Sequence, residues 1–194
     1  MIAIVDYKTG NLRSVENALH RLGAEYCVTA DADRLRNADR VILPGVGTAA
    51  EAMHNLHEAG LTEVLVNLRR PVLGICVGLQ VMCRHSEEGD VAGLGIFDAH
   101  VCRFPDSPAE KVPHMGWNSI GNLDGKLFRD LRNGEYVYYV HSYYPTLCQD
   151  TVATTRHGVL FSAALKYENF YGTQFHPEKS GAVGEQILKN FLLL

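Results

Sequence analysis

The first half of the chain alternates short apolar runs with amphipathic stretches. Apolar runs begin at residues 2, 24, 40 and 71, where the sequence reads IAIV, AEYCVTA, RVILPG and PVLGIC. Such runs between turn residues predict strands buried on both faces of a sheet. Gly23 ends a predicted helix whose apolar residues recur at helical spacing: Leu12, Val15, Leu19 and Leu22. The alternation predicts a mostly parallel sheet with helices on both faces.

Four more helices are predicted further along the chain. Thr48 and Glu51 are spaced as a capping box at the start of a helix over 48–59. Residues 61–70 read as helical, and another helix begins at about 77, directly after the strand over 71–76. The last helix covers 181–193, where apolar residues again recur at helical spacing.

The second half is richer in strands. Strands are predicted over 95–104, 135–145, 151–158, 159–167 and 170–178, and the short links between them favour antiparallel pairing at one side of the sheet. The chain contains no internal repeat, low-complexity tract or linker-like stretch. We therefore expect one α/β domain over residues 1–194: a three-layer sandwich with a mostly parallel twisted sheet and antiparallel strands at one side.

Composition and charge narrow the classes of protein. Of the 194 residues 46% are hydrophobic and 21% charged, and the net charge of −4 does not favour a nucleic-acid surface. The apolar runs fall short of the roughly 20 residues that span a bilayer, and the first residues lack the pattern of a signal peptide. The five scattered cysteines contain no Cys-x-x-Cys, which favours free thiols. We expect a cytoplasmic protein without nucleic-acid or membrane partners.

Cys76 lies between Gly74 and Gly78, where the strand over 71–76 meets the next helix. In an open α/β sheet, sites form at the carboxyl ends of the strands. Small flanking residues let the chain turn sharply and expose the central side chain, and a helix amino terminus favours the thiolate. A small buried cysteine packed between glycines explains the same pattern equally well.

The stretch TQFHPEK carries the groups that a nucleophilic cysteine needs. His176 and Glu178 are two residues apart, so on an extended strand their side chains share a face. Glu178 can then orient the imidazole, whose other nitrogen is the base for Cys76. An incidental pair at a strand end explains the tripeptide alone better. Together with Cys76, the catalytic interpretation is favoured.

Acyl chemistry also needs donors for an oxyanion. The N–H of Val77 follows the cysteine directly, and the loop LPGVGTA suggests the Val46–Gly47 region as the second donor. This loop lacks the ending of a phosphate loop, and no dinucleotide fingerprint follows the first strand, so a nucleotide- or flavin-binding module is disfavoured. His54 and His57 have no acidic or cysteine partners nearby. We expect neither a metal nor a cofactor.

The motifs PGVG, GICVGLQ, HSYY and FHPE, in this order and spacing, resemble the class I, triad-type glutamine amidotransferases. Within that family, DYKTGNLRSV, PHMGWN, HSYY and FHPEKSG resemble the glutaminase subunits of imidazole glycerol phosphate synthase, a heterodimer of histidine biosynthesis. The resemblance implies hydrolysis of L-glutamine through a Cys76 thioester. It also implies delivery of the ammonia to a cyclase subunit with a TIM-barrel fold.

The resemblance further implies roles for residues outside the triad. It places the substrate against Gln80, Glu88 and the backbone of Ser142 and Tyr143, although a solvated helix surface explains Gln80 and Glu88 as well. His141 reads as a satisfied strand-end histidine. The implied partner interface contains Asn11, Trp117, Tyr138 and Lys179. Core packing is the alternative for the two aromatic residues.

Another small class I glutaminase, such as the subunit of pyridoxal phosphate synthase, is the nearest alternative. That family resembles this chain at FHPE. It would read Gly-Gly-Glu-Ser in place of PGVG, and it lacks PHMGWN.

Overall fold

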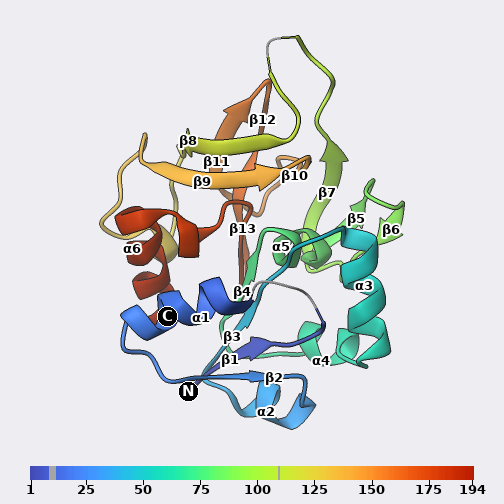
Figure 1. The fold of residues 1–194 in the computed structure, drawn as a ribbon, viewed down its shortest axis with the longest axis vertical. Helices are drawn as coiled ribbons and strands as arrows, with labels where there is room; N and C mark the ends of the chain where they lie inside the picture. Colours follow the sequence, from blue (N-terminus) through green and yellow to red (C-terminus); the bar gives the residue numbers. More distant parts are fainter. Residues whose placement is uncertain (9–11, 109) are drawn as a thin grey trace.

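The computed structural model describes residues 1–8, 12–108 and 110–194. Within these ranges a seven-stranded sheet has the order β11-β12-β13-β4-β3-β1-β2 (Figure 1). Neighbours from β2 to β13 are parallel, whereas β12 and β11 pair antiparallel at one edge, as predicted. These strands are β1 Ile2–Val5, β2 Tyr26–Thr29, β3 Arg40–Leu43, β4 Val72–Ile75, β11 Thr151–His157, β12 Val159–Tyr167 and β13 Phe170–Thr173.

Helices flank the parallel part of the sheet. Figure 1 shows α1 (Leu12–Arg21) and α6 (Gly181–Leu192) on one side of it and α3 (Ala49–Glu58) and α5 (Val77–Met82) on the other. The predicted cap of α3 is confirmed, because the Thr48 hydroxyl accepts a hydrogen bond of 3.2 Å from the N–H of Glu51. Gly23 adopts a φ of 66° just beyond α1, as a helix-ending glycine does.

Several element boundaries differ from the predictions. The helix that begins at residue 77 ends at Met82, because the chain enters strand β5 (Cys83–Ser86) there. The helix predicted over 61–70 shortens to α4 (Thr62–Val66), and α2 (Ala32–Asn37), capped by Asp31, was not predicted. The predicted strand over 135–145 breaks at Ser142, because its two halves, β9 (Tyr136–His141) and β10 (Tyr143–Pro145), join different sheets.

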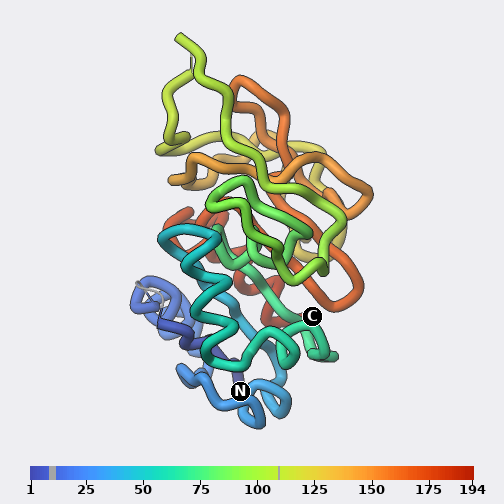
Figure 2. Tube along the Cα trace, turned by 90° about the vertical axis from the view of Figure 1, so that its right-hand side faces the viewer, coloured from blue at the N-terminus to red at the C-terminus, as the bar shows by residue number. Residues whose placement is uncertain are grey.

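Two smaller sheets lie beside the antiparallel edge. One contains β10, β7 (Phe97–Arg103), β5 and β6 (Val91–Ala92), and the other is the hairpin of β8 (His114–Ser119) and β9. Figures 1 and 2, seen from directions 90° apart, both place β7 and this hairpin at the opposite end of the molecule from β1 and β2. Short single-turn helices η1 (Lys126–Phe128) and η2 (Pro177–Lys179) complete the described elements.

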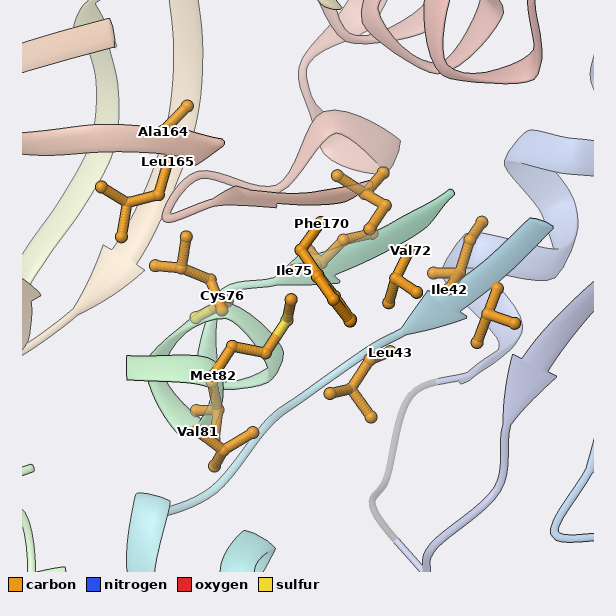
Figure 3. Packing of buried hydrophobic residues seen from close by; sticks show 14 of the residues in the cluster. Ile42, Leu43, Val72, Ile75, Cys76, Val81, Met82, Ala164, Leu165 and Phe170 are labelled. Carbon is orange, nitrogen blue, oxygen red and sulfur yellow. The ribbon is translucent and has the colours of Figure 1, made fainter. Parts of the chain in front are cut away.

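A hydrophobic cluster runs through the molecule from Ile2 to Phe191. Figure 3 shows side chains of β3, β4, α5 and β13 packed around the β4–α5 junction, among them Leu43, Val72, Met82 and Phe170. The junction that carries Cys76 therefore rests on a continuous apolar core.

None of the helices in the described part of the chain has the length and hydropathy needed to cross a membrane.

Two glycines bring the loop after β3 onto the start of α5. A Cβ at Gly78 would lie 1.9 Å from the carbonyl oxygen of Leu43, and a Cβ at Gly45 would lie 2.3 Å from the N–H nitrogen of Gly78. Both distances are far below van der Waals contact with rigid backbone. The glycines are therefore required for the close approach of residues 44–47 to the β4–α5 junction.

We predict that Gly78→Ala lowers the free energy of unfolding by about 2–3 kcal/mol, because an added methyl group overpacks this contact. Gly121→Ala is the matched control, since a Cβ there meets no heavy atom within 4 Å. Urea unfolding followed by circular dichroism measures both variants. Equal stability of Gly78→Ala and Gly121→Ala would show that the approach is not tight.

Candidate active site

Cys76 connects β4 to α5 in a strained backbone conformation. Its φ of 54° and ψ of −111° are unusual for a residue with a side chain, and such a conformation costs about 1–3 kcal/mol. The backbone on either side holds it, because its N–H donates to the carbonyl of Thr173 at 2.8 Å and its carbonyl accepts from Gln80 N–H at 3.1 Å. The turn between strand and helix therefore holds the thiol in the geometry of a nucleophile elbow.

His176 and Glu178 meet Cys76 from the segment after β13. The Nδ1 atom of His176 lies 2.8 Å from the Glu178 carboxylate, and the Cys76 side chain lies close enough to the ring to raise its pKa. The side chains of His176 and Glu178 are only 3% and 4% exposed. A buried nucleophile, base and orienting carboxylate are thus in contact, which is the arrangement that nucleophilic catalysis requires.

The extended strand predicted to bring His176 and Glu178 together is wrong in its last residues. An extended strand was expected to carry His176 and Glu178 on one face, but β13 ends at Thr173 and residues 177–179 form the single turn η2. Pro177 lies at the start of this turn, where its fixed φ suits a helical backbone. The turn, rather than strand alternation, brings the Glu178 carboxylate back onto the His176 ring.

The His176 ring holds a proton across the neutral range. Burial alone would lower its pKa, but the neighbouring Cys76 and Glu178 side chains outweigh burial and raise the pKa to about 10. An opposite charge within hydrogen-bonding distance favours the charged form of a base. The site therefore holds a protonated imidazole next to the Cys76 sulphur.

A cavity of about 220 Å³ opens onto Cys76 and His176. It is also lined by the residues predicted to supply oxyanion donors and substrate contacts: Val46, Gly47, Val77, Gln80, Glu88, Ser142 and Tyr143. Glu178 lies behind His176 and does not line it, while Lys179, predicted at the partner interface, does. Segments far apart in the sequence thus converge on one small concave site, as ligand sites do.

Gln80 is buried, so the interpretation as a solvated helix surface is wrong. Its amide nitrogen donates to the carbonyl of Tyr143 at 3.0 Å and to the Gln174 side chain at 2.9 Å. Gln174 in turn donates to the Cys76 sulphur at 3.7 Å. The sequence patterns did not predict this role for Gln174, although its place two residues before His176 in TQFHPE was a usable signal.

Glu88 lies in the cavity wall, on the segment after β5 rather than on a helix. Its carboxylate accepts from the N–H of Ala49, the first residue of α3, at 2.8 Å. Burial raises the pKa of Glu88, and the Ala49 hydrogen bond partly offsets this effect. A half-buried acid therefore faces the same small space as the thiol.

The β8–β9 hairpin presents an apolar outer face beside the cavity. Trp117 is 55% exposed, and its ring makes an edge contact with Tyr138, its partner in the strand register. Met115 and Tyr136 are also exposed on this hairpin. Core packing is therefore wrong for Trp117, whereas Tyr138 is half-buried. Asn11, the remaining predicted interface residue, lies outside the described residues.

In the described part of the chain, no three His, Cys, Asp or Glu side chains come together in a way that could hold a metal ion. The ionisable side chains that line the cavity include Cys76, Glu88, His141, His176 and Lys179.

Comparison with known proteins places this fold. The family model described as Glutamine amidotransferase class-I matches residues 3–194. A crystal structure of a glutamine amidotransferase superposes with a TM-score of 0.74 at 18% identity, covering 100% of this chain and 98% of that one. A glutamine amidotransferase from Thermotoga maritima superposes with a TM-score of 0.67 at 19% identity, covering 98% of this chain and 81% of that one. The fold is that of glutamine amidotransferases.

Curated relatives identify the subgroup of the family to which this chain belongs. The chain is 55% identical to the imidazole glycerol phosphate synthase subunit HisH of Bacteroides thetaiotaomicron, over 98% of both chains. It is 46% identical to the protein of the same name from Pectobacterium atrosepticum, again over 98% of both. The chain therefore belongs to the class I glutamine amidotransferases and, within them, to the HisH subunits of imidazole glycerol phosphate synthase.

We predict that Cys76→Ala lowers the pKa of His176 from about 10 toward its ordinary value of 6.5, because the Cys76 side chain is one of the two groups that raise it. NMR titration of the imidazole measures the change. Cys27→Ala is the control, since Cys27 lies on β2, outside the cavity. A His176 pKa that stays near 10 in Cys76→Ala would contradict the effect of Cys76 on the His176 ring.

Proposed function

We propose that this chain hydrolyses L-glutamine to L-glutamate and ammonia, with Cys76 as nucleophile, His176 as general acid and base, and Glu178 as the group that orients His176. The observation that carries the proposal is that Cys76 and His176 line one small cavity together while Glu178 hydrogen-bonds the far side of the His176 ring. Membership of the class I glutamine amidotransferases supports the substrate.

In the first half-reaction, the Cys76 sulphur attacks the side-chain amide carbon of glutamine, and a tetrahedral oxyanion forms. Protonated His176 donates its Nε2 proton to the departing nitrogen, because Nδ1 is engaged by Glu178. The carbon–nitrogen bond breaks, ammonia leaves, and a glutamyl thioester remains on Cys76. The raised pKa of His176 keeps this proton available at neutral pH.

In the second half-reaction, neutral His176 takes a proton from water as the water oxygen attacks the thioester carbonyl. The carbon–sulphur bond breaks, glutamate forms, and the thiolate–imidazolium pair is restored. The Val77 N–H and the Val46–Gly47 peptide region are the proposed donors to both oxyanions, and each lines the cavity next to Cys76.

The cavity wall supplies groups for the amino-acid end of glutamine. Glu88 is the proposed partner of the α-ammonium group, since it is a carboxylate in the wall. The backbone at Ser142 and Tyr143 is the proposed partner of the α-carboxylate. Gln80 supports this wall through its bond to the Tyr143 carbonyl.

We infer that a partner enzyme accepts the ammonia. A glutaminase of this kind is useful only when docked to an acceptor enzyme, because free ammonia escapes or is protonated. The names of the relatives support a heterodimer with the TIM-barrel cyclase subunit of imidazole glycerol phosphate synthase, in the cytoplasmic pathway of histidine biosynthesis. The pyridoxal phosphate synthase alternative is not favoured, since these relatives carry the HisH name.

The apolar face of the β8–β9 hairpin is the proposed docking surface, with Lys179 at its border with the cavity. Exposed aromatic and methionine side chains are typical of interface cores. The Tyr138 backbone connects this face to the site: its carbonyl accepts from His176 N–H at 2.9 Å, and its N–H donates to Ser180 Oγ at 2.9 Å. Docking at Tyr138 can therefore act on the backbone that positions His176.

The chemistry is tested by glutamate release in the presence of the cyclase partner with its nucleotide ligand. We expect Cys76→Ala to abolish release and Cys27→Ala to retain it, because only Cys76 lies in the cavity. The unmodified chain without the cyclase is expected to be a poor glutaminase. Appreciable turnover by Cys76→Ala would refute the nucleophile assignment, and full activity without cyclase would argue against control by the partner.

Docking is tested by calorimetry with the cyclase subunit. We predict that Trp117→Ala weakens binding about 30-fold, corresponding to about 2 kcal/mol for a buried aromatic anchor, and that Lys179→Ala also weakens it. Tyr167→Ala is the matched control, since Tyr167 is an exposed aromatic residue on β12, outside the hairpin. Unchanged affinity of Trp117→Ala and Lys179→Ala would rule out this docking surface.

A further inference from the structure

Two buried histidines beside the cavity have no part in the proposed chemistry. His114 on β8 and His141 on β9 face each other in the hairpin register and are 5% and 6% exposed. His141 lines the cavity and precedes Ser142. Around them lie the rings of Phe104, Tyr139 and Phe161. A buried polar pair in an aromatic setting is costly unless each nitrogen is satisfied.

The hydrogen bonds of these rings fix where each proton lies. The Nδ1 atom of His141 is 2.7 Å from the carbonyl of Tyr143, and a carbonyl only accepts, so this nitrogen carries the hydrogen. The Nε2 atom of neutral His141 must then accept, and it lies 2.9 Å from Nδ1 of His114. His114 is therefore also protonated at Nδ1, and its Nε2 accepts from the Asn118 side-chain amide at 3.1 Å.

Asn118 fixes the far end of this chain of donors. Its amide nitrogen also donates to the carbonyl of Arg156 at 3.0 Å, and its oxygen accepts from the N–H of Ser119 at 2.8 Å. The amide cannot be reversed without setting donor against donor and acceptor against acceptor. One direction of donation therefore runs from Asn118 through His114 and His141 to Tyr143.

Both rings stay neutral in this environment. Burial and the neighbouring His157 ring lower the pKa of His114 to about 4. Burial, with smaller contributions from His114, His157 and His176, lowers the pKa of His141 to about 3, against the Tyr143 hydrogen bond. An added proton on His141 would place two N–H groups against each other. The hydrogen bonds from Asn118 through His114 and His141 to Tyr143 therefore keep one direction while nearby His176 is charged.

This series of hydrogen bonds ends at the backbone of the cavity wall, where substrate is proposed to bind. The Tyr143 carbonyl accepts from both His141 and Gln80, which occupies its two lone pairs. The Ser142 carbonyl accepts from the N–H of Phe104 at 3.0 Å. The two carbonyls belong to the peptide groups on either side of Tyr143, so both peptide groups are held and the backbone of Ser142 and Tyr143 is fixed.

We propose that His141, braced by His114 and Asn118, is a positioning residue that orients the Ser142–Tyr143 backbone for the carboxylate end of the substrate. This inference rests on the proposed function for the identity of that substrate. His141 touches no reacting atom. Its effect is on binding of glutamine, not on the chemical steps at Cys76.

Kinetics of the chain with its cyclase partner test the proposal. Loss of one buried hydrogen bond corresponds to about tenfold in binding, so His141→Leu is expected to raise KM for glutamine about tenfold while kcat changes less than about threefold. His141→Asn, whose amide can replace the Nδ1 donor, is expected to restore KM to within about threefold of the unmodified chain. His157→Leu is the matched control, because His157 stacks on His114 but makes no bond to Tyr143.

His114→Leu provides a second variant that removes the brace but keeps the His141 ring, and a smaller rise in KM is expected. If His141→Leu does not fold, the KM values of His114→Leu and His141→Asn test the positioning role of His141. Wild-type KM in His141→Leu, or in His114→Leu when His141→Leu does not fold, would overturn the positioning role. So would a fall in kcat without a rise in KM.

A second measurement is independent of glutamine. The ¹⁵N chemical shifts of the imidazole nitrogens in the free full-length chain report the tautomer of each ring, and both His114 and His141 are expected in the Nδ1–H form at neutral pH. An Nε2–H or charged His141 would overturn the donor chain. If the unmodified complex releases no glutamate, the proposed function fails, while these shifts still test the histidine arrangement.

Discussion

The contact of His176 with Cys76 on one side and Glu178 on the other is the interaction on which the site depends. It places a charged ring where burial alone would keep the ring neutral, and the pKa of His176 rises to about 10 because Cys76 and Glu178 face the ring. The contact needs Cys76 in its left-handed backbone conformation and Glu178 on the turn η2. The interaction therefore depends on the β4–α5 junction and the segment after β13 together.

Histidines in the same wall are held in opposite states. His141 lies near enough to His176 for the charge of one to affect the other, yet its pKa falls to about 3 while that of His176 rises. The difference lies in the partners, because His141 meets a carbonyl and a neutral ring, whereas His176 meets the Glu178 carboxylate and the Cys76 sulphur. Environment assigns a neutral structural role to one and a charged, proton-donating role to the other.

Sequence patterns predicted the parallel strands, the elbow at Cys76 and the loop at Val46–Gly47, because each depends on local spacing or a short motif. The family resemblance, rather than these patterns, implied that Gln80, Glu88, Ser142 and Tyr143 contact the substrate. They did not predict β8, whose HMGWNS sequence lacks a regular apolar alternation, or the turn that places Glu178. Gln174 and His114 were missed because their contacts join residues that are distant in sequence. Tertiary contacts, rather than periodicity, decide these features.

Trapping of the thioester intermediate tests the central claim most directly. The complex with the cyclase subunit is mixed with glutamine, quenched in acid and digested. The masses of the cysteine-containing peptides are then measured by mass spectrometry. A glutamyl adduct on the Cys76 peptide is the expected result, since covalent catalysis passes through this species. Glutamate release with no adduct, or with the adduct on any of the other four cysteines, would contradict the account.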